Sequence, residues 1–285
     1  MQPGGKRQRP AKQQLRSNCL RAHQGAPRAK EDFMADIGSE TLTEKHKNDM
    51  YGDVDNPAAI ENAPPAVPAA TVVLLRDTDQ GPEVLMLRKN SRIAFGGMWV
   101  FPGGRIDPED YPEDGNKDVG ARNAAAREAH EEAGVELDPQ DFVWFAHWTP
   151  PPSTPKRFAT WFFAARAGKD AISIDGGEIE DHRWIRPGDA LAKHAEGEID
   201  LVPPTWVTLY HLSQRHSVAA VLGHFAGREA RVYQTRVVKR ADGVRVAMWT
   251  GDAGYDDWNA DLSGPRHRLN MPAGGFSFEN TVVDY

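Results

Sequence analysis

The sequence contains a single cysteine, Cys19, among its 285 residues. One cysteine excludes an intramolecular disulfide and any zinc site built on two or more thiolates. The chain also lacks the run of about 18 apolar residues that a membrane-spanning helix needs, and no apolar run of roughly 7–15 residues follows the N-terminus as in a secretory signal. These absences favour a soluble protein of a reducing compartment, and we expect a cytoplasmic location with no membrane partner.

Acidic residues are absent from residues 1–30, which hold eight of the 34 Lys and Arg residues. The rest of the chain therefore has 26 basic against 41 acidic residues, a formal charge of −15. An acidic body argues against a protein that coats nucleic acid and suits one that handles a divalent metal or a metal-bound anion. A transit peptide and a nucleic-acid tail are alternatives for the basic leader, but its Pro and Gly residues and its lack of aromatics favour a plain extension.

Residues 1–69 show no sustained apolar periodicity, and residues 56–70 form a Pro- and Ala-rich linker. We therefore expect residues 1–69 to be disordered. The folded domain is expected over residues 70–285, with a C-terminal extension from about residue 203.

Beyond residue 70 the pattern changes to strands mixed with helices. Two apolar runs, 71–76 and 83–88, flank a turn-rich segment and predict a hairpin. An Ala-rich helix is expected over residues 118–133, with Asp118 as its N-cap and Gly134 ending it. Further strands are expected at 98–101, 142–148, 157–165, 183–185, 231–240, 244–250 and 275–278, and helices at 205–214 and 218–225. Strands and helices without regular alternation indicate an α+β fold.

Three carboxylates share one face of the expected helix. Glu128, Glu131 and Glu132 stand at i, i+3 and i+4, so their side chains gather within one turn. Like charges at this spacing destabilise a helix by roughly 0.2–0.5 kcal/mol per pair, and Arg127 can relieve only part of the repulsion. Hard oxygen donors without Cys or paired His suit Mg²⁺ or Mn²⁺. Taken alone, three glutamates also fit a solvated helix face.

The glutamates belong to a longer motif, since residues 127–135 read REAHEEAGV and follow WVFPGG at residues 99–104. This combination resembles the Nudix hydrolase superfamily, whose box is written G-x5-E-x7-R-E-U-x-E-E-x-G-U, with U an apolar residue. The opening glycine is matched by Gly104. The second half is matched at every fixed position, by Arg127, Glu128, Ala129, Glu131, Glu132, Gly134 and Val135. The likeness extends from about residue 70 to about residue 215.

The sequence departs from the box between its two halves. Gly104 and Arg127 are separated by 22 residues where the box has 13, so nine are inserted, and Val119 stands where the first glutamate is expected. We expect an acidic residue between Asp107 and Asp118 to take its place, with Asp107 the first choice because it is nearest the glycine turn.

The expanded box is similar to that of the branch that includes the peroxisomal coenzyme A diphosphatases. That branch also has a coenzyme A pattern upstream of the box, and here Arg88 and Arg92 stand in nearly the right places. The pattern is only partly present.

The resemblance implies a Nudix-type α/β/α sandwich with a mixed sheet, here with extra C-terminal helices and strands and a disordered N-terminal extension. It implies a pyrophosphohydrolase that cleaves a phosphoanhydride bond in a nucleoside diphosphate linked to another moiety, as in coenzyme A-like, ADP-ribose or dinucleotide substrates. Mg²⁺ or Mn²⁺ would be held by the three glutamates and a backbone carbonyl of the glycine turn, with Arg127 orienting the carboxylates. The residues concerned are Glu128, Glu131, Glu132, Gly104 and Arg127.

Five further residues are candidates for contact with the substrate. Glu178 and Glu180 follow the helix in a loop, where the family often places one more carboxylate, although a solvated loop is the alternative. Arg157 and Phe158 could clamp a phosphate or stack on a base, although a structural strand arginine fits as well. Arg88 comes from the partial coenzyme A pattern.

Two functions of different kinds fit the sequence. The first is the metal-dependent hydrolase, whose partner is a small nucleotide-derived molecule. The second is a non-catalytic Nudix-like module that senses a nucleotide, which the missing box glutamate allows. Three clustered glutamates favour the enzyme, because a binding module needs no such repulsive group. The sequence leaves the oligomeric state open, with a homodimer among the alternatives.

Overall fold

The computed structural model describes residues 49–55, 63–92 and 95–282. The expectations for residues 1–48 and for residues 56–62 of the Pro- and Ala-rich linker lie outside these residues. The larger sheet contains β1 (Val67–Thr78), β2 (Gly81–Lys89), β3 (Trp99–Val100), β4 (Gly103–Arg105), β5 (Val143–Thr149), β6 (Phe158–Arg166), β7 (Ile179–Ile185) and β8 (Arg231–Gln234). The smaller sheet contains β9 (Arg236–Lys239), β10 (Arg245–Met248), β11 (His267–Met271) and β12 (Ser277–Asn280). The helices are α2 (Lys117–Ala133), α3 (Pro187–Ala195), α4 (Pro203–Leu212) and α5 (Val218–Ala226), with the 3₁₀ turns η1 (Pro108–Asp110) and η2 (Pro139–Asp141).

The larger sheet is mixed, as expected. Its main path runs β3-β2-β1-β6-β5-β8, while β4 adds to β1 and β7 to β2. β1 pairs in parallel with β6, and β5 pairs in parallel with β8, whereas the other pairs are antiparallel. The smaller sheet, β12-β11-β10-β9, is antiparallel throughout.

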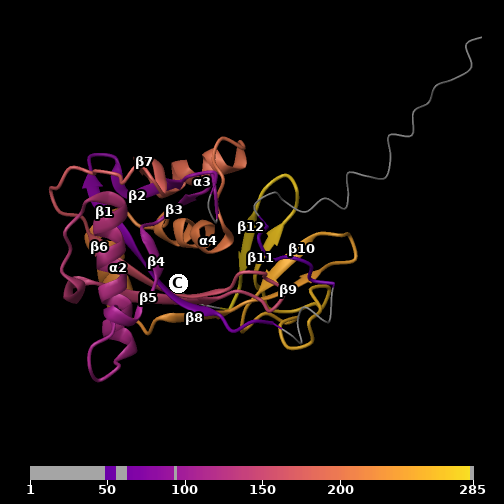
Figure 1. The fold of residues 1–285 in the computed structure, drawn as a ribbon. Helices are drawn as coiled ribbons and strands as arrows, with labels where there is room; N and C mark the ends of the chain where they lie inside the picture. The colour runs from indigo at the N-terminus through magenta and orange to yellow at the C-terminus, as the bar shows by residue number, and fades with distance from the viewer. Residues whose placement is uncertain (1–48, 56–62, 93–94, 283–285) are drawn as a thin grey trace, which may run out of the picture. The chain divides into compact units, whose positions relative to one another are not determined.

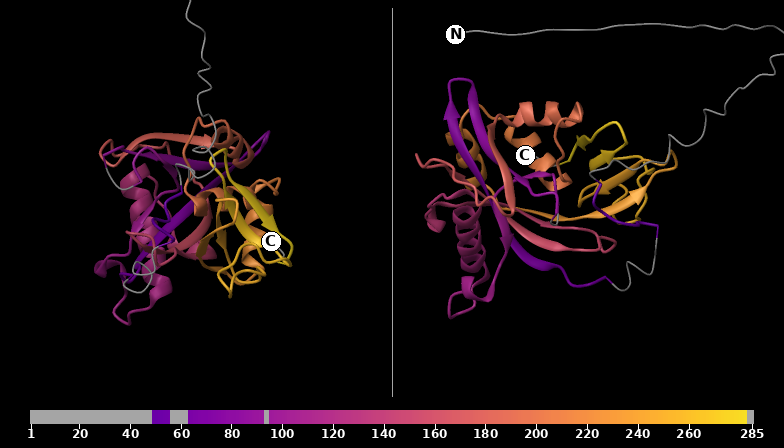
Figure 2. Two further views of the ribbon diagram at one scale, coloured as in Figure 1. Left: turned by 90° about the vertical axis from the view of Figure 1, so that its right-hand side faces the viewer. Right: turned by 45° about the horizontal axis from the view of Figure 1, so that its top comes forward.

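The larger sheet is covered on both faces, which gives a sandwich. On one face Val72 and Leu74 of β1 pack with the alanines of α2, and on the other face Val73 and Leu75 pack with α4, α5 and part of the smaller sheet. Because successive side chains of a strand point to opposite faces, β1 is apolar at every position from 72 to 75. In Figure 1 and in the right-hand view of Figure 2, α2 in magenta and the orange α3 and α4 lie on opposite sides of the sheet, with the yellow C-terminal strands beyond them.

Helix α2 begins slightly earlier than the sequence predicts, and its N-cap is Asn116, not Asp118. The Asn116 side chain accepts hydrogen bonds from the backbone N–H groups of Asp118 and Val119. The carboxylate of Asp118 instead accepts from Arg122 at 2.8 Å, one turn further on. The predicted end is confirmed, because Gly134 has a φ of 68° there, in the left-handed region that favours glycine.

The single strand expected over residues 231–240 is wrong, since the chain changes sheet at Thr235. The N–H of Thr235 donates to the carbonyl of Thr149, which ends β8 on the larger sheet, and its hydroxyl accepts from the Trp249 indole. Residues 236–239 then pair with β10. The two strands have the same short pattern, two apolar residues between polar ones (RVYQ and RVVK), so the sequence carries no sign of the change. The sequence also gave no indication of β4, β11 and α3.

Residues 49–55, which we call the strap, lie against the folded domain although they fall within the segment expected to be disordered. Tyr51 is 3% exposed and belongs to the core between the larger sheet and the C-terminal strands. Asp49 forms an ion pair with Arg245 of β10 at 2.8 Å. Ordered contacts therefore begin before residue 70, through side chains that follow no periodic pattern.

Within residues 49–55, 63–92 and 95–282, none of the helices has the length and apolar character needed to cross a membrane.

Candidate functional site

The glycine turn after β3 lies between β1 and helix α2. Gly103 pairs with Thr71 and Gly104 with Ala70 of β1. A Cβ on Gly103 would lie 2.7 Å from the Cβ of Thr71, and one on Gly104 would lie 2.2 Å from Oε1 of Glu128. Because a Cβ on Gly103 would also lie 2.5 Å from the backbone carbonyl oxygen of Ala70, only glycine fits there, whereas a side chain at residue 104 would displace the Glu128 carboxylate.

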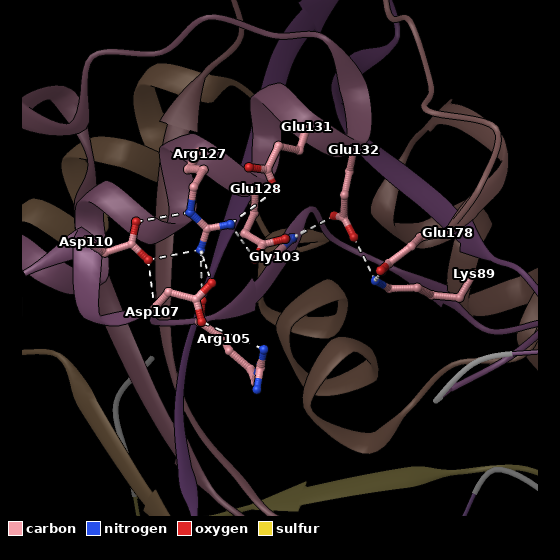
Figure 3. A network of polar contacts seen from close by, with 10 residues as sticks. All are labelled: Lys89, Gly103, Arg105, Asp107, Asp110, Arg127, Glu128, Glu131, Glu132 and Glu178. Carbon is pink, nitrogen blue, oxygen red and sulfur yellow. Dashed lines mark hydrogen bonds and ion pairs between the residues drawn. The ribbon is translucent and has the colours of Figure 1, made fainter.

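The three glutamates of α2 face this turn, as Figure 3 shows, but in different surroundings. The side chain of Glu132 is 5% exposed, that of Glu128 16% and that of Glu131 55%. Burial raises the pKa of Glu128 and of Glu132 above the usual value, because desolvation disfavours the charged carboxylate. We call the three glutamates and the glycine turn the carboxylate wall.

Arg127 stands at the centre of an ion-pair network (Figure 3). Its guanidinium donates to both carboxylate oxygens of the buried Asp110, at 3.0 and 2.9 Å. It also donates to Glu128 at 3.0 Å and to Glu131 at 3.1 Å. These bonds, those to Asp110 above all, hold the pKa of Arg127 above its usual value. Arg127 therefore fixes two of the three glutamates to the segment inserted between the halves of the motif.

Glu132 is held from the opposite side. One carboxylate oxygen accepts from the Gly103 N–H at 2.9 Å, and the other pairs with the Lys89 ammonium at 2.6 Å. Lys89 also reaches Glu178, at 3.5 Å. Each of the three glutamates thus accepts at least one hydrogen bond within the described part of the chain.

The carboxylate wall lines a cavity of about 1060 Å³. The cavity extends from α2 along β1 and β6 to the strap and the start of α4. Aromatic side chains form much of its lining: Tyr51, Phe95, Phe101, Trp148, Phe158 and Phe162. The carboxylate wall is therefore one end of a cavity that these six aromatic side chains help to line.

The donor set fits a hard divalent cation, because it offers carboxylate oxygens and a backbone turn. Burial raises the pKa of Glu128 and of Glu132, so a bound cation would stabilise the charged form of both carboxylates. Within the described residues, however, no three His, Cys, Asp or Glu side chains are grouped as a ready-made metal site. The carboxylates point instead to Arg127, Lys89 and Gly103.

The remaining candidates from the sequence are divided between two places. Phe158 and Glu178 line the main cavity. Arg88 forms an ion pair with Glu180 at 3.1 Å and lines a separate cavity of about 250 Å³. Arg157 donates to the backbone carbonyls of residues 64 and 150, as a structural arginine would.

The inserted segment does bring acidic groups to the wall. Asp107 lines the cavity and lies 3.8 Å from Arg127, whereas Asp110 is buried and makes the closest contacts to that arginine. Asp118 lies with Arg122 at the start of α2. Asp107 is thus the acidic residue of the insertion that faces the cavity, and Asp110 is the one that anchors the arginine.

Lys89 is a site residue that the sequence reasoning missed. It follows Arg88 on β2, and adjacent strand residues point to opposite faces. Only one of the two can therefore face α2. Leu85 and Leu87 of β2 pack with the alanines of α2, and Lys89 follows two residues later, so strand geometry places it on the same side.

Comparisons with known proteins agree with the motif. A family model described as NUDIX domain matches residues 65–204. Similar solved structures include a NUDIX hydrolase from Alicyclobacillus acidocaldarius, with 24% identity over 53% of this chain and 92% of that chain and a TM-score of 0.46. The NUDIX domain of Shewanella oneidensis NrtR complexed with ADP ribose has 19% identity over 56% of this chain and 91% of that chain, with a TM-score of 0.41. An Ap4A hydrolase from C. elegans has 21% identity over 52% of this chain and 96% of that chain, with a TM-score of 0.37. No curated protein matches the sequence.

Proposed function

We propose that this protein hydrolyses a phosphoanhydride bond in a nucleoside diphosphate linked to another moiety, because residues 65–204 belong to the Nudix hydrolases. The members of that family are pyrophosphohydrolases that typically use divalent metals. The cofactor proposed is Mg²⁺ or Mn²⁺. The observation that carries the proposal is the carboxylate wall at one end of the 1060 Å³ cavity. A cavity of this size suits a ligand larger than a nucleoside monophosphate.

Glu128, Glu131 and Glu132 would hold the metal, together with a backbone carbonyl at Gly104. A bound divalent ion supplies charge neutralisation of the phosphates and lowers the pKa of a bound water. The residues of this chain supply position. Arg127 holds Glu128 and Glu131 at fixed places, and Gly103 holds Glu132.

Among the other candidates, Phe158 and Glu178 are proposed to contact the substrate, because both line the cavity. The positions of Arg88, Glu180 and Arg157 do not support such a contact. Arg88 was the link to the coenzyme A branch, so the structure adds nothing in favour of that branch. Coenzyme A-like molecules, ADP-ribose and dinucleotides therefore stand as equal candidates.

A substrate panel tests the proposal. The full-length protein is incubated with coenzyme A, ADP-ribose, diadenosine tetraphosphate and nucleoside triphosphates, each with Mg²⁺, with Mn²⁺ and with EDTA, and products are identified by mass. Running the active pairs in ¹⁸O-labelled water shows which phosphorus receives the oxygen. Metal-dependent cleavage at a phosphoanhydride bond is the expected result. Tight binding of a nucleotide without products under any metal would refute hydrolysis and support the sensing module.

A further inference from the structure

Glu132 differs from the other two glutamates of the carboxylate wall, because both of its carboxylate oxygens are bonded. Within the described residues, Glu128 and Glu131 use one carboxylate oxygen each. In Glu132 one oxygen accepts from the Gly103 N–H at 2.9 Å, and the other accepts from the Lys89 ammonium at 2.6 Å. A metal ion that binds Glu132 must therefore share this carboxylate with a donor of the chain.

Of these two donors, only the lysine can move without disturbing the sheet. The Gly103 N–H belongs to a backbone that pairs with Thr71 of β1. The backbone of Lys89 is fixed as well, since its N–H donates to the carbonyl of Met98 at 3.0 Å. Its ammonium, however, lies at the end of a flexible four-carbon chain. The ammonium can therefore leave Glu132 while the strand that carries it stays in place.

A second carboxylate lies within reach of the Lys89 ammonium (Figure 3). The ammonium is 2.6 Å from the Glu132 carboxylate and 3.5 Å from that of Glu178. The backbone of Glu178 is anchored beside it, because its carbonyl accepts from the Asn90 N–H at 2.8 Å and its N–H donates to the Asp175 carboxylate at 2.8 Å. A small rotation of the lysine side chain is thus enough to exchange one carboxylate for the other.

The two carboxylates differ in their access to water. The side chains of Lys89 and Glu132 are 12% and 5% exposed, whereas that of Glu178 is 66% exposed. Two cations on one carboxylate repel each other, and the repulsion is strongest where little water screens it. A divalent ion bound by Glu132 would therefore drive the ammonium away, and Glu178 offers the ammonium a negative charge in a more exposed position.

We propose that Lys89 is a built-in competitor of the metal, whose ammonium holds the Glu132 carboxylate until a divalent ion binds there and then moves to Glu178. This inference rests on the proposed function, from which it takes the position of the ion. It makes Lys89 a positioning residue that acts through Glu132, and it makes metal binding an exchange of one cation for another. The affinity for the metal is then lower than the glutamates alone would give, because only molecules in which Lys89 has left Glu132 can bind the ion.

Metal titrations without any nucleotide test the exchange. The full-length protein is titrated with Mn²⁺ in a calorimeter. Lys89→Met removes the ammonium and keeps an unbranched side chain. The matched control is Lys193→Met on α3, which makes the same change of charge at a lysine that pairs with Glu198 at 2.5 Å and does not line the cavity. We expect the Kd of Mn²⁺ to fall about 3- to 10-fold in Lys89→Met and to stay unchanged in Lys193→Met.

The role of the second carboxylate is tested by Glu178→Gln. In this variant Lys89 loses the carboxylate to which it moves, so the Kd of Mn²⁺ should rise about 3-fold. In the double variant Lys89→Met/Glu178→Gln, the Kd should lie within about twofold of that of Lys89→Met, because Glu178 matters here only through the lysine. A loss of affinity that persists in the double variant would show that Glu178 binds the ion itself, and it would refute the exchange.

A measurement on the unmodified protein avoids any loss of stability in Lys89→Met. Lysines are labelled with an amine-reactive ester with and without Mn²⁺, and the labelled peptides are quantified by mass. We expect Mn²⁺ to increase the labelling rate of Lys89 about 3-fold or more, because its ammonium moves towards the exposed Glu178. Lys193 is the internal reference, and its rate should not change. A Lys89 rate that stays the same or falls with Mn²⁺ would contradict the movement.

A purely structural ion pair gives a different result in the titrations. Lys89→Met would then leave the Kd of Mn²⁺ unchanged or raise it, and either outcome would overturn the inference while hydrolysis by the unmodified protein stays intact. Failure of the proposed function looks different, since no phosphoanhydride bond is cleaved although Lys89→Met and Lys193→Met still differ in their Kd of Mn²⁺. Absence of Mn²⁺ binding in every variant would refute both the exchange and the proposed metal.

Discussion

The two ends of the cavity differ in how many of their polar groups have hydrogen-bond partners within the described part of the protein. At the carboxylate wall, Glu128, Glu131 and Glu132 each accept hydrogen bonds from Arg127, Lys89 or Gly103. At the far end, near residues 49–55, the Tyr51 and Thr154 hydroxyls and the Trp148 indole N–H are buried and have no hydrogen-bond partner among the residues that the structure describes. The charged end is thus held in place by its own ion pairs, whereas the far end holds buried polar groups without such partners. This contrast predicts that substitutions at the two ends differ in their effects.

The largest effect is expected from the carboxylate wall itself. Glu131→Gln and Glu132→Gln replace an anionic donor by a neutral amide of similar shape, which weakens divalent binding without leaving a cavity. We expect turnover to fall by about 100-fold or more in each variant, with excess Mn²⁺ restoring part of it. Steady-state rates against metal concentration measure this.

Glu136→Gln is the matched control for this experiment, because Glu136 lies just past α2, is highly exposed and does not line the cavity. Its turnover should equal that of the unmodified protein. Normal rates in both cavity variants would remove these glutamates from the metal site and with them the contrast between the two ends.

Next in size is the effect of breaking the Lys89–Glu132 pair. Lys89→Met leaves the carboxylate of Glu132 buried without its cation, and removal of one partner of a buried pair costs about 3 kcal/mol of unfolding free energy. Urea unfolding measures the loss. The double variant Lys89→Met/Glu132→Gln should recover most of it, because the uncompensated charge is gone. A single variant as stable as the unmodified protein would show that Glu132 does not depend on this ion pair.

A smaller effect is expected from the anchor of Arg127. Asp110→Asn removes the charge but keeps the shape, so Arg127 loses its strongest partner and the two glutamates it holds become less fixed. By analogy with groups that orient metal ligands, kcat should fall about 10-fold while KM changes little. Asp118→Asn, which weakens the pair with Arg122 at the start of α2, should leave kcat unchanged. An equal fall in kcat for the two substitutions would mean that Asp110 supports the helix in general and does not position Arg127.

The smallest effect is expected on the free energy of unfolding when the pH is lowered, and it again differs between regions of the molecule. Burial lowers the pKa of His211 to about 3 and that of His267 to about 4, both near the C-terminal strands. Below about pH 6.5 the unfolded chain therefore binds protons that the folded state does not bind. The free energy of unfolding decreases as the pH falls towards these pKa values. Between pH 7 and pH 6 each histidine should lower the free energy of unfolding by less than about 1 kcal/mol.

Glu128 and Glu132 act in the opposite sense, because their pKa is raised and the folded state takes up protons first. Urea unfolding of the unmodified protein and of His267→Gln at several pH values tests the histidine contribution. Between pH 7 and pH 5 the free energy of unfolding should decrease less in the variant than in the unmodified protein. Identical slopes would mean that the His267 ring does not resist protonation.

The sequence predicted that the three glutamates lie together, but it did not predict the ordered contacts of the strap. Glu128, Glu131 and Glu132 are neighbours on one helix, and helical geometry alone brings them together. The glycine end of α2 was predicted for the same reason, since it depends on a local pattern, whereas the mixed sheet was expected only from the resemblance to the Nudix hydrolases.

The strap, by contrast, contacts residues that are far away in the chain. The Ser153–Tyr51 hydrogen bond spans 102 positions, and the Arg245–Gly52 bond spans 193. Nothing in the neighbourhood of Tyr51 in the sequence signals such partners. The change of sheet at Thr235 was missed for a related reason, because side-chain alternation reports that a strand exists but not which sheet it joins.

The strap also has a consequence for the order in which the molecule is made. The bond between Arg245 and Gly52 cannot form until the 193 residues between them have been synthesised, which takes about 10–40 s at roughly 5–20 residues per second. The motif that carries the carboxylates is complete long before that moment. A nascent chain thus assembles its charged end early and gains the far end of its cavity only as the last strands leave the ribosome.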